Sequence, residues 1–338
     1  MSRLPAVLAV DGGGSKIDAA LLRRDGTVIG AGRVVVDHDR NADEPHLQRI
    51  IAGVSAACRD AGLDPDRRPV ADVGAFCLAG ADLPADDRRI QRWLKHQGFT
   101  TDRLVRNDTF AVLRAGTERT WGVGIVCGFG TNCSGVAPDG RTYRLPAVGE
   151  ISGDWGGATD LGSAALWHAL RAGDGRGPRT AFQRLVPEHF HLRSARQVME
   201  AIYFERLDEG RLSELAPVVF RAARDGDAIA RSVVDRQADE VAVMACAAIR
   251  RLRMTRLDVD VVLGGGIFRT DDRGFFARIE DGIHAVAPGA TVTVLTDPPV
   301  IGAAQLGLDE VRASRAAHAR VRAALTHERL TTHTHRRR

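Results

Sequence analysis

Long apolar runs are missing from the 338-residue sequence, whose apolar stretches are short and interrupted by Gly, Asp or Arg. A membrane-spanning helix needs about 20 consecutive apolar residues, so none is predicted. The first apolar stretch stops at Asp11 and lacks the longer apolar core and small-residue cleavage site of a signal peptide. We therefore expect a cytoplasmic protein without a membrane partner.

Closely paired cysteines are also missing. The five cysteines form an odd number and contain no C-x-x-C pair. A secreted domain held by disulfides, or a structural zinc site, normally shows an even count or closely spaced pairs. We expect buried, reduced thiols, with neither a disulfide framework nor zinc.

Aromatic residues make up only 5% of the chain, and lysine occurs only at positions 16 and 95. The formal net charge of +4 would fit a nucleic-acid partner, but much of the basic excess lies in residues 312–338. A chain with so few aromatic side chains has little with which to stack bases. No nucleic-acid partner is therefore expected.

The first part of the chain predicts an antiparallel meander followed by alternating helices and strands. A strand (6–10) ends at a glycine-rich turn, a second strand (17–22) ends at an Asp-Gly hairpin signal, and a third strand (27–36) follows. The later elements are expected in the order helix 46–61, strand 73–78, helix 87–96, strand 104–106 and helix 109–115.

The order of strand, glycine-rich turn, strand, Asp-Gly turn and strand returns from residue 121, which indicates a duplicated unit. The expected later elements are strands 121–127 and 133–137, helices 160–172, 194–206, 211–224 and 228–253, strands 258–263 and 291–295, and a last helix from 299. We predict two α/β domains, 1–116 and 117–312, with a ligand cleft between them. Residues 313–338 are expected to begin as a helical extension and to end as a partly disordered basic tail.

Three glycine-rich turns follow predicted strands, at residues 12–14, 128–130 and 264–266. Glycine lets a backbone approach a phosphate closely, and the free N–H groups of such turns bind anions. Neither G-x-x-x-x-G-K-[ST] nor a strand followed by G-x-G-x-x-G occurs, which excludes a P-loop and a dinucleotide fingerprint. Three such turns in a two-domain chain favour phosphate binding by another nucleotide fold.

The carboxylate of Asp11, directly before the first turn, has two interpretations. It could hold Mg²⁺ through water, since Mg²⁺ keeps much of its hydration shell, or it could simply form the turn. Ser15 and Lys16 would face the phosphates through a hydrogen bond and a point charge. Lys16 gains weight because the chain uses arginine almost everywhere else.

Two further carboxylates lie at predicted helix starts. Asp108, in the sequence Arg106-Asn107-Asp108-Thr109, could orient a hydroxyl and accept its proton during phosphoryl transfer, or it could cap the helix. Asp160, in a polar glycine-rich segment, could accept hydrogen bonds from sugar hydroxyls or cap its helix. Position alone favours neither interpretation.

With these pieces in this order, residues 5–310 resemble the N-acetylglucosamine kinase family and the wider group of ATPases that includes the benzoyl-CoA reductase activators. The matching segments are 11–16, 107–109, 128–133, 155–163, 174–178, 264–266 and 298–304. The resemblance implies an actin-like ATPase (ribonuclease H-like) fold, in which two α/β domains with mixed five-stranded sheets flanked by helices close around ATP and substrate. It further implies ATP and Mg²⁺ as cofactors, a small-molecule sugar as substrate, and a homodimer.

The resemblance also implies roles for individual residues, with Asp108 as the catalytic base. The implied sugar contacts are Asn41, Asn107, Gly130, Asn132 and Asp160. The implied ATP contacts are Gly12, Gly13, Gly14, Ser15, Lys16, Thr131, Gly264, Gly265 and Gly266, with Asp11 as the metal-binding carboxylate.

The sequence departs from the family in two places. The second phosphate loop usually reads Gly-Thr-Gly but here is Gly128-Phe129-Gly130, with Thr131 as the nearest replacement for the lost hydroxyl. After Trp155-Gly156 the family usually carries a His and then Gly-Asp-Glu-Gly-Ser, whereas this chain is one residue shorter and reads Asp160-Leu161-Gly162-Ser163. These departures leave the identity of the sugar open.

Three functions are compatible with these observations. The first is a kinase that phosphorylates N-acetylglucosamine or a related amino sugar at the C6 hydroxyl. The second is an ATPase that couples hydrolysis to a conformational change in a partner protein, although the spacing of Cys127 and Cys133 does not match the cluster-binding cysteines of the reductase activators. The third is a non-catalytic sugar sensor, which Phe129 keeps open but which would need a DNA-binding module.

Overall fold

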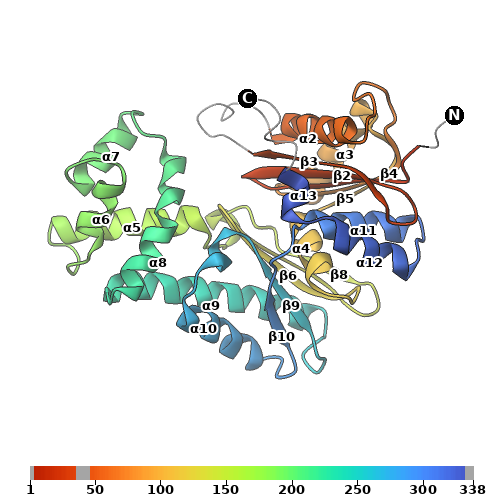
Figure 1. The fold of residues 1–338 in the computed structure, drawn as a ribbon. Helices are drawn as coiled ribbons and strands as arrows, with labels where there is room; N and C mark the ends of the chain where they lie inside the picture. The colour runs from red at the N-terminus through yellow and green to blue at the C-terminus, as the bar shows by residue number, and fades with distance from the viewer. Residues whose placement is uncertain (1–3, 36–45, 332–338) are drawn as a thin grey trace.

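The computed structural model describes residues 4–35 and 46–331 and arranges them around two five-stranded mixed sheets with helices on their faces (Figure 1). The predicted fold class is therefore confirmed. Within the described part of the chain, no helix is both long enough and apolar enough to cross a membrane.

The first sheet has the strand order β3-β2-β1-β4-β5. Its strands are β1 (Val7–Gly12), β2 (Lys16–Leu22), β3 (Val28–Val35), β4 (Ala71–Leu78) and β5 (Thr100–Arg106). The central strand β1 pairs antiparallel with β2 and parallel with β4, and every residue of β1 is buried. A strand covered on both faces needs a continuous apolar run, which explains why apolar residues precede Asp11 without interruption.

The second sheet has the order β10-β9-β6-β7-β8. Its strands are β6 (Gly122–Cys127), β7 (Thr131–Val136), β8 (Thr142–Arg144), β9 (Asp260–Gly264) and β10 (Thr291–Val294). β6 pairs antiparallel with β7 and parallel with β9, as β1 does with β2 and β4. The duplicated unit predicted from the sequence is thus confirmed.

Helices cover both sheets. Those after the first meander are α2 (His46–Asp60), α3 (Pro84–Gln97) and α4 (Asp108–Gly116). Those inserted between β8 and β10 are α5 (Ala158–Gly173), α6 (Phe182–His189), α7 (Ala195–Tyr203), α8 (Ala216–Arg224), α9 (Ala228–Arg251) and α10 (Arg273–His284). Short 3₁₀ helices also occur, namely η1 (Glu150–Ser152), η2 (Glu209–Leu215) and η3 (Gly266–Arg269).

One helix prediction in this region was wrong, and one helix was missed. The segment 211–224 is not one helix, because 209–215 forms η2 and α8 begins only at Ala216. Pro217 lies in the first turn of α8, where a residue without an N–H costs no helical hydrogen bond. The helix α6 was not predicted at all. Together α5 to α8 form a helical lobe that extends away from the second sheet (green in Figure 1).

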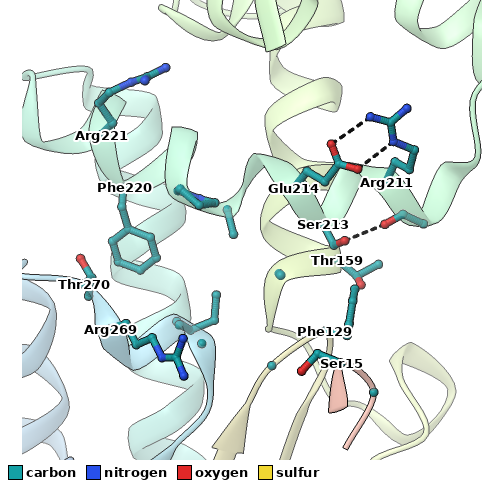
Figure 2. Close-up of a pocket in the computed structure, with 18 of the residues that line it drawn as sticks. Ser15, Phe129, Thr159, Arg211, Ser213, Glu214, Phe220, Arg221, Arg269 and Thr270 are labelled. Atoms are coloured by element: carbon teal, nitrogen blue, oxygen red, sulfur yellow. Dashed lines mark hydrogen bonds and ion pairs between the residues drawn. The ribbon is translucent and has the colours of Figure 1, made fainter. Parts of the chain in front are cut away.

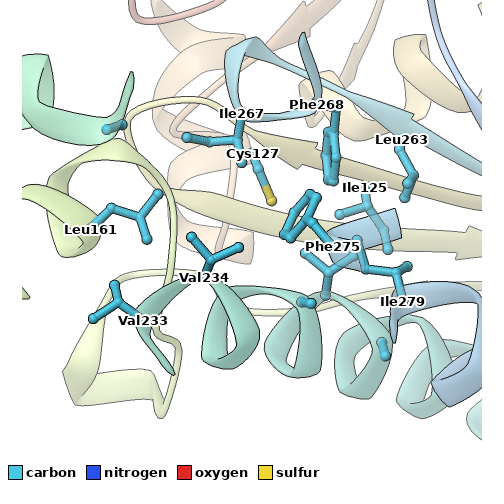
Figure 3. Packing of buried hydrophobic residues seen from close by; sticks show 14 of the residues in the cluster. Ile125, Cys127, Leu161, Val233, Val234, Leu263, Ile267, Phe268, Phe275 and Ile279 are labelled. Carbon is cyan, nitrogen blue, oxygen red and sulfur yellow. The ribbon is translucent and has the colours of Figure 1, made fainter. Parts of the chain in front are cut away.

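The second sheet packs on α9 and α10 through a large apolar core. Figure 3 shows Cys127 surrounded by apolar side chains from β6, α9, α10 and η3, among them Val234, Ile267 and Phe275. All five cysteines are buried and unpaired, as expected. Burial raises the pKa of Cys127 to about 12, so this thiol stays protonated and unreactive at neutral pH.

The end of the described chain returns to the first sheet. Its helices are α11 (Val300–Glu310), α12 (Arg315–Ala324) and α13 (His327–Thr331). Ile301, Val321 and Leu330 share one apolar cluster with Val7 and Ala9 of β1. The predicted range 117–312 for the second domain does not account for this return, since α11 packs with the first sheet. Helical structure does continue past residue 312 as expected, while 332–338 lie outside the described residues.

Candidate active site

Two adjoining pockets open where the first turns of the two meanders approach each other. The larger has a volume of about 1150 Å³ and the smaller about 330 Å³. Both are lined by Gly14, Ser15, Gly128, Phe129 and Gly266, which belong to the three glycine-rich turns. The turns predicted to bind phosphate thus meet at the junction of the two pockets.

Most of the predicted polar site residues line the smaller pocket. They are Asp11, Ser15, Lys16, Asn107, Asp108, Gly130, Thr131, Asn132 and Asp160, together with Gly13, Gly14, Gly265 and Gly266. Gly12 and Gly264 are buried at the ends of β1 and β9 and line neither pocket. Asn41 lies outside the described residues. The structure therefore brings together residues that are as much as 255 positions apart along the chain, from Asp11 to Gly266.

Asp11 is the one acidic residue of β1 and lies opposite Asp18 of β2. Only 5% of Asp11 is exposed, and burial, followed by the charges of Asp18 and Asp108, raises the pKa of its carboxyl well above the usual range. Asp18 is neutralised by Arg33, whose Nε and Nη2 lie 2.6 and 2.7 Å from its two carboxylate oxygens. Among the residues that the structure describes, no guanidinium pairs with Asp11 in this way, so a nearby cation would relieve its unfavourable burial.

Lys16 shares this environment. Its Nζ lies 3.6 Å from Oδ2 of Asp18. Sequence analysis found Lys16 but missed the Asp18–Arg33 pair. A signal was present, because Asp18 is a charged residue inside an otherwise apolar, buried strand, where an ion normally needs a partner.

Asp108 is not the cap of α4. The N-cap is Asn107, whose Oδ1 accepts the backbone N–H of Thr109 at 3.0 Å, so the capping interpretation of Asp108 was wrong. The Asp108 carboxyl is buried and lines the smaller pocket. Burial, and secondly the charge of Asp82, raises its pKa to about 7. A carboxyl with that pKa is suited to exchange a proton near neutral pH.

Asp82, in the turn after β4, was missed by the sequence analysis. Its Oδ1 accepts hydrogen bonds from Nδ2 of Asn107 at 2.9 Å and from Nδ2 of Asn132 at 2.8 Å. Burial, and then the charge of Asp86, raises the pKa of Asp82 to about 6. The only signal was its place beside Gly80 at the end of a buried strand, which is too common a pattern to single it out.

The second turn is held by the start of α5. The carbonyl oxygens of Gly128 and Phe129 accept the backbone N–H groups of Ala158 and Thr159 at 2.9 and 3.0 Å. Gly157 is the N-cap, with φ of 85°, and a Cβ there would lie 2.5 Å from two carbonyl oxygens of the turn. The free N–H groups of a helix N-terminus therefore fix this turn.

Asp160 lies in the first turn of α5 and accepts the backbone N–H of Gly156 at 2.6 Å. It therefore supports the helix start without being the N-cap. Burial raises the pKa of its carboxyl. The side chain also lines the smaller pocket, so its local structural role leaves a ligand contact open.

The two side chains that follow Gly128 point in different directions. Oγ1 of Thr131 lies 3.0 Å from Sγ of Cys127 and 3.8 Å from Sδ of Met244, which directs it toward the core. Phe129 is 37% exposed, and a Cβ placed on Gly14 would lie 3.0 Å from its ring. The ring therefore lies against the first turn, in the position where the family usually has a threonine.

The larger pocket extends from this junction toward the helical lobe. Figure 2 shows Ser15 and Phe129 at one end and Phe220, Arg269 and Thr270 at the other. Nε of Arg211 lies 2.7 Å from Oε1 of Glu214 along its wall. The side chains at the far end and along this wall come from η2, α8 and the end of η3, and no sequence motif pointed to them.

The chain is similar to proteins of a known ATPase family and to two named kinases. The BadF/BadG/BcrA/BcrD ATPase family profile matches residues 8–307. The chain is 26% identical over 263 residues to the N-acetylmuramic acid/N-acetylglucosamine kinase of Clostridium acetobutylicum, covering 77% of this chain and 85% of that protein. It is 25% identical over 314 residues to the N-acetyl-D-glucosamine kinase of Dictyostelium discoideum, covering 89% and 97%.

Solved structures share the fold. A Chromobacterium violaceum protein with the provisional name N-acetylglucosamine kinase superposes with a TM-score of 0.67 at 22% identity, covering 90% of this chain and 99% of that one. A ROK hexokinase from Thermus thermophilus gives a TM-score of 0.54 at 17% identity, with the same coverage. The predicted enzyme class, an ATP-dependent phosphotransferase with an alcohol acceptor, is supported by the named kinases. Because its profile spans nearly the whole chain, the protein belongs to the BadF/BadG/BcrA/BcrD ATPase family.

Proposed function

We propose that the protein is an ATP-dependent kinase that phosphorylates N-acetylglucosamine or a closely related amino sugar at the C6 hydroxyl. One observation carries the proposal: a buried carboxyl, Asp108, with a pKa of about 7, lies in a small polar pocket that adjoins the glycine-rich turns. Phosphoryl transfer to an alcohol needs a base at this position and phosphate-binding turns beside it. Both curated relatives carry names of kinases acting on amino sugars, which supports the substrate class.

The two pockets suit the two substrates by size and lining. The larger, with Phe220 and Ile267 on its walls, would take the nucleoside, and the turns at its inner end would take the phosphates. The smaller is lined by Asp108, Asn132 and Asp160, which offer hydrogen bonds to a polyhydroxy ligand. Each substrate would thus meet the other at Gly14 and Gly128.

The Asp11 carboxyl fits a Mg²⁺ ion that accompanies ATP. The described residues contain no group of three His, Cys, Asp or Glu that could hold a metal by themselves. Mg²⁺ bound with substrate phosphates typically uses only one or two protein carboxylates and several waters. Asp11 lines the smaller pocket beside the first turn and would supply such a carboxylate, because a bound cation favours the ionised form that burial disfavours. When bound, the ion would neutralise charge on the transferring phosphoryl group.

In the proposed step the C6 oxygen of the sugar attacks the γ-phosphorus of ATP. The bond from that phosphorus to the β–γ bridging oxygen breaks, and ADP leaves. Asp108 accepts the proton that the sugar hydroxyl loses, which requires its carboxyl to be ionised before the reaction. Lys16 and the N–H groups of the turns would bind the phosphates in the transition state.

The coupled-ATPase alternative receives no support from the cysteines. Cys127 and Cys133 are both fully buried, whereas a cluster shared between subunits needs thiolates at a surface. Burial also raises the pKa of both thiols. The cytoplasmic location and the homodimer remain predictions, and light scattering of the purified protein would test the latter.

The test is ADP release with ATP and Mg²⁺ against N-acetylglucosamine, glucosamine, glucose, N-acetylmuramic acid and N-acetylmannosamine. We expect sugar-dependent turnover that falls about 100-fold or more in Asp108→Asn, because general base catalysis typically contributes that much. Asp102→Asn, an exposed residue of β5, is the matched control and should keep full activity. Phosphorus NMR of the product would locate the phosphate. If none of these sugars stimulates ADP release, the kinase proposal is refuted, and the coupled ATPase or the sensor is favoured.

A further inference from the structure

Asp82 has a connection that its local sequence does not explain. It lies in the connection between β4 of the first sheet and α3. One of its partners, Asn132, is the first buried residue of β7 in the second sheet. The other partner, Asn107, immediately precedes the proposed base. A single carboxylate oxygen therefore joins the two halves of the molecule beside Asp108.

The orientation of both amides follows from their other contacts. Oδ1 of Asn107 accepts the N–H of Thr109 at 3.0 Å, and Oδ1 of Asn132 accepts the N–H of Cys133 at 2.7 Å. Because each amide oxygen is occupied as an acceptor, each amide NH₂ is the group directed to Asp82. The carboxylate is thus held in place from two sides.

The second oxygen of Asp82 differs from the first. Among the residues that the structure describes, no hydrogen bond reaches Oδ2 of Asp82, and the side chain lines the smaller pocket. An ionised carboxylate can only accept, and a sugar hydroxyl can donate. A carboxylate already fixed by two amides would bind such a hydroxyl with little loss of side-chain freedom.

We propose that Asp82 determines acceptor specificity: Oδ1 holds Asn107 and Asn132, while Oδ2 accepts a hydrogen bond from a ring hydroxyl of the sugar other than the one phosphorylated. This inference deepens the proposed function and rests on it. It also assigns Asp82 an influence on the base. Of the charged groups around it, Asp86 of α3 and Asp154 raise the pKa of Asp82, Arg144 of β8 lowers it, and Asp82 in turn raises that of Asp108.

The test compares sugar and ATP kinetics of the full-length wild type, Asp82→Asn and Asp82→Ala. Asparagine can still present one oxygen to the two amides, but it places an NH₂ where the carboxylate accepted a hydroxyl. We expect Asp82→Asn to raise the KM for the sugar about tenfold, as for one charge-assisted hydrogen bond, without changing the KM for ATP. Asp82→Ala should also lose the amide contacts and lower kcat.

Two further readouts separate this role from a structural one. The acidic limb of kcat/KM should move to lower pH in Asp82→Asn, because a negative charge near Asp108 is removed. The 3-deoxy or 4-deoxy sugar that lacks the contacted hydroxyl should bind more weakly than the parent sugar to wild type. In Asp82→Asn, the deoxy sugar and the parent sugar should bind about equally well. Asp86→Asn, which removes a neighbouring charge without touching the amides, is the control and should keep the sugar KM within about twofold of wild type.

A wild-type sugar KM and an unmoved acidic limb in Asp82→Asn would overturn this inference alone. Equal rises in the KM values for sugar and ATP would also overturn it, since they indicate general damage to the cleft. Absence of sugar-dependent turnover in the wild-type protein would instead overturn the proposed function, and this inference with it.

Discussion

The two meanders have the same strand order, but the turns at their ends are built differently. In the first, Asp11 and Asp18 occupy the pair of positions next to the turn; in the second, the corresponding pair is Val126 and Asn132. The first turn is therefore surrounded by charge, including Lys16 and Arg33. The second is uncharged, and the start of α5 holds it through backbone hydrogen bonds.

We infer from this difference that the two turns of the duplicated scaffold have different tasks. A turn rich in charge can bind metal and phosphate but depends on ion pairs to offset burial. A turn fixed by a helix N-terminus needs no charged side chain to keep its shape. Substitutions in the first turn should therefore lower turnover strongly, whereas the second turn should tolerate side-chain changes better.

The largest effect is expected for Asp11→Asn, which tests the charged turn directly. Removing the carboxylate that we propose holds Mg²⁺ should lower kcat on the order of 1000-fold, since such an ion supplies several kcal/mol of charge stabilisation. The companion change in the second turn, Asn132→Asp, adds a charge at the position that corresponds to Asp18. Turnover of Asp11→Asn within about tenfold of wild type at saturating Mg²⁺ would contradict the metal role.

Features of the two turns that depend on neighbouring residues could be predicted from the sequence, whereas those that depend on distant segments could not. The strands and glycine-rich turns follow from local patterns, so both meanders and their turns were predicted. The Asp18–Arg33 pair, the bridge through Asp82 and the return of α11 to the first sheet depend on contacts between distant segments. A local pattern shows which face of a helix is apolar but not which sheet it will cover.

The next effect concerns pH and the carboxyl groups near the first turn. With the pKa of Asp108 at about 7, kcat/KM should fall tenfold for each pH unit below that value, because only the ionised carboxylate accepts a proton. Stability should change in the opposite sense. A carboxyl whose folded-state pKa is raised stabilises the fold when protonated, and this stabilisation is lost as pH rises through about 7.

Thermal unfolding and steady-state kinetics at pH 5 to 8 would measure both trends. Asp108→Asn should lower turnover about 100-fold, without the acidic fall in kcat/KM. It should also be more stable than wild type at pH 8, by about 4 kcal/mol at most. Phe129→Thr, in the uncharged turn, should leave both pH midpoints unchanged. Parallel changes in activity and stability would contradict the assignment of Asp108 as the titrating base.

A smaller effect is expected when the second turn receives the family's usual residue. Phe129→Thr removes a ring that lies against Gly14 and supplies a hydroxyl beside the proposed phosphate site. One added hydrogen bond to a charged group should lower the KM for ATP by roughly tenfold or less. Phe129→Ala opens the same space without a hydroxyl and separates the two causes. An unchanged KM in both variants would show that Phe129 does not limit nucleotide binding.

The smallest effect concerns the connection between the two sheets. Arg322 of α12 donates hydrogen bonds to the carbonyl oxygens of Ala115 and Thr117, where the chain passes from the first sheet to the second. Its Nη1 also lies 3.9 Å from Oδ2 of Asp297, where the chain returns to the first sheet. Arg322→Ala should lower stability by about 1–2 kcal/mol, or roughly 2–4 °C in Tm. Arg320→Ala, two residues away, removes a pair with Asp25 in which both side chains are more than half exposed, and should cost less than about 0.5 kcal/mol.

Because Arg322 contacts both connections, its loss should also raise the proteolysis rate near Thr117, whereas a general loss of stability would raise cleavage throughout the chain. Equal effects of the two variants would mean that the C-terminal helices cover the first sheet without restraining its link to the second.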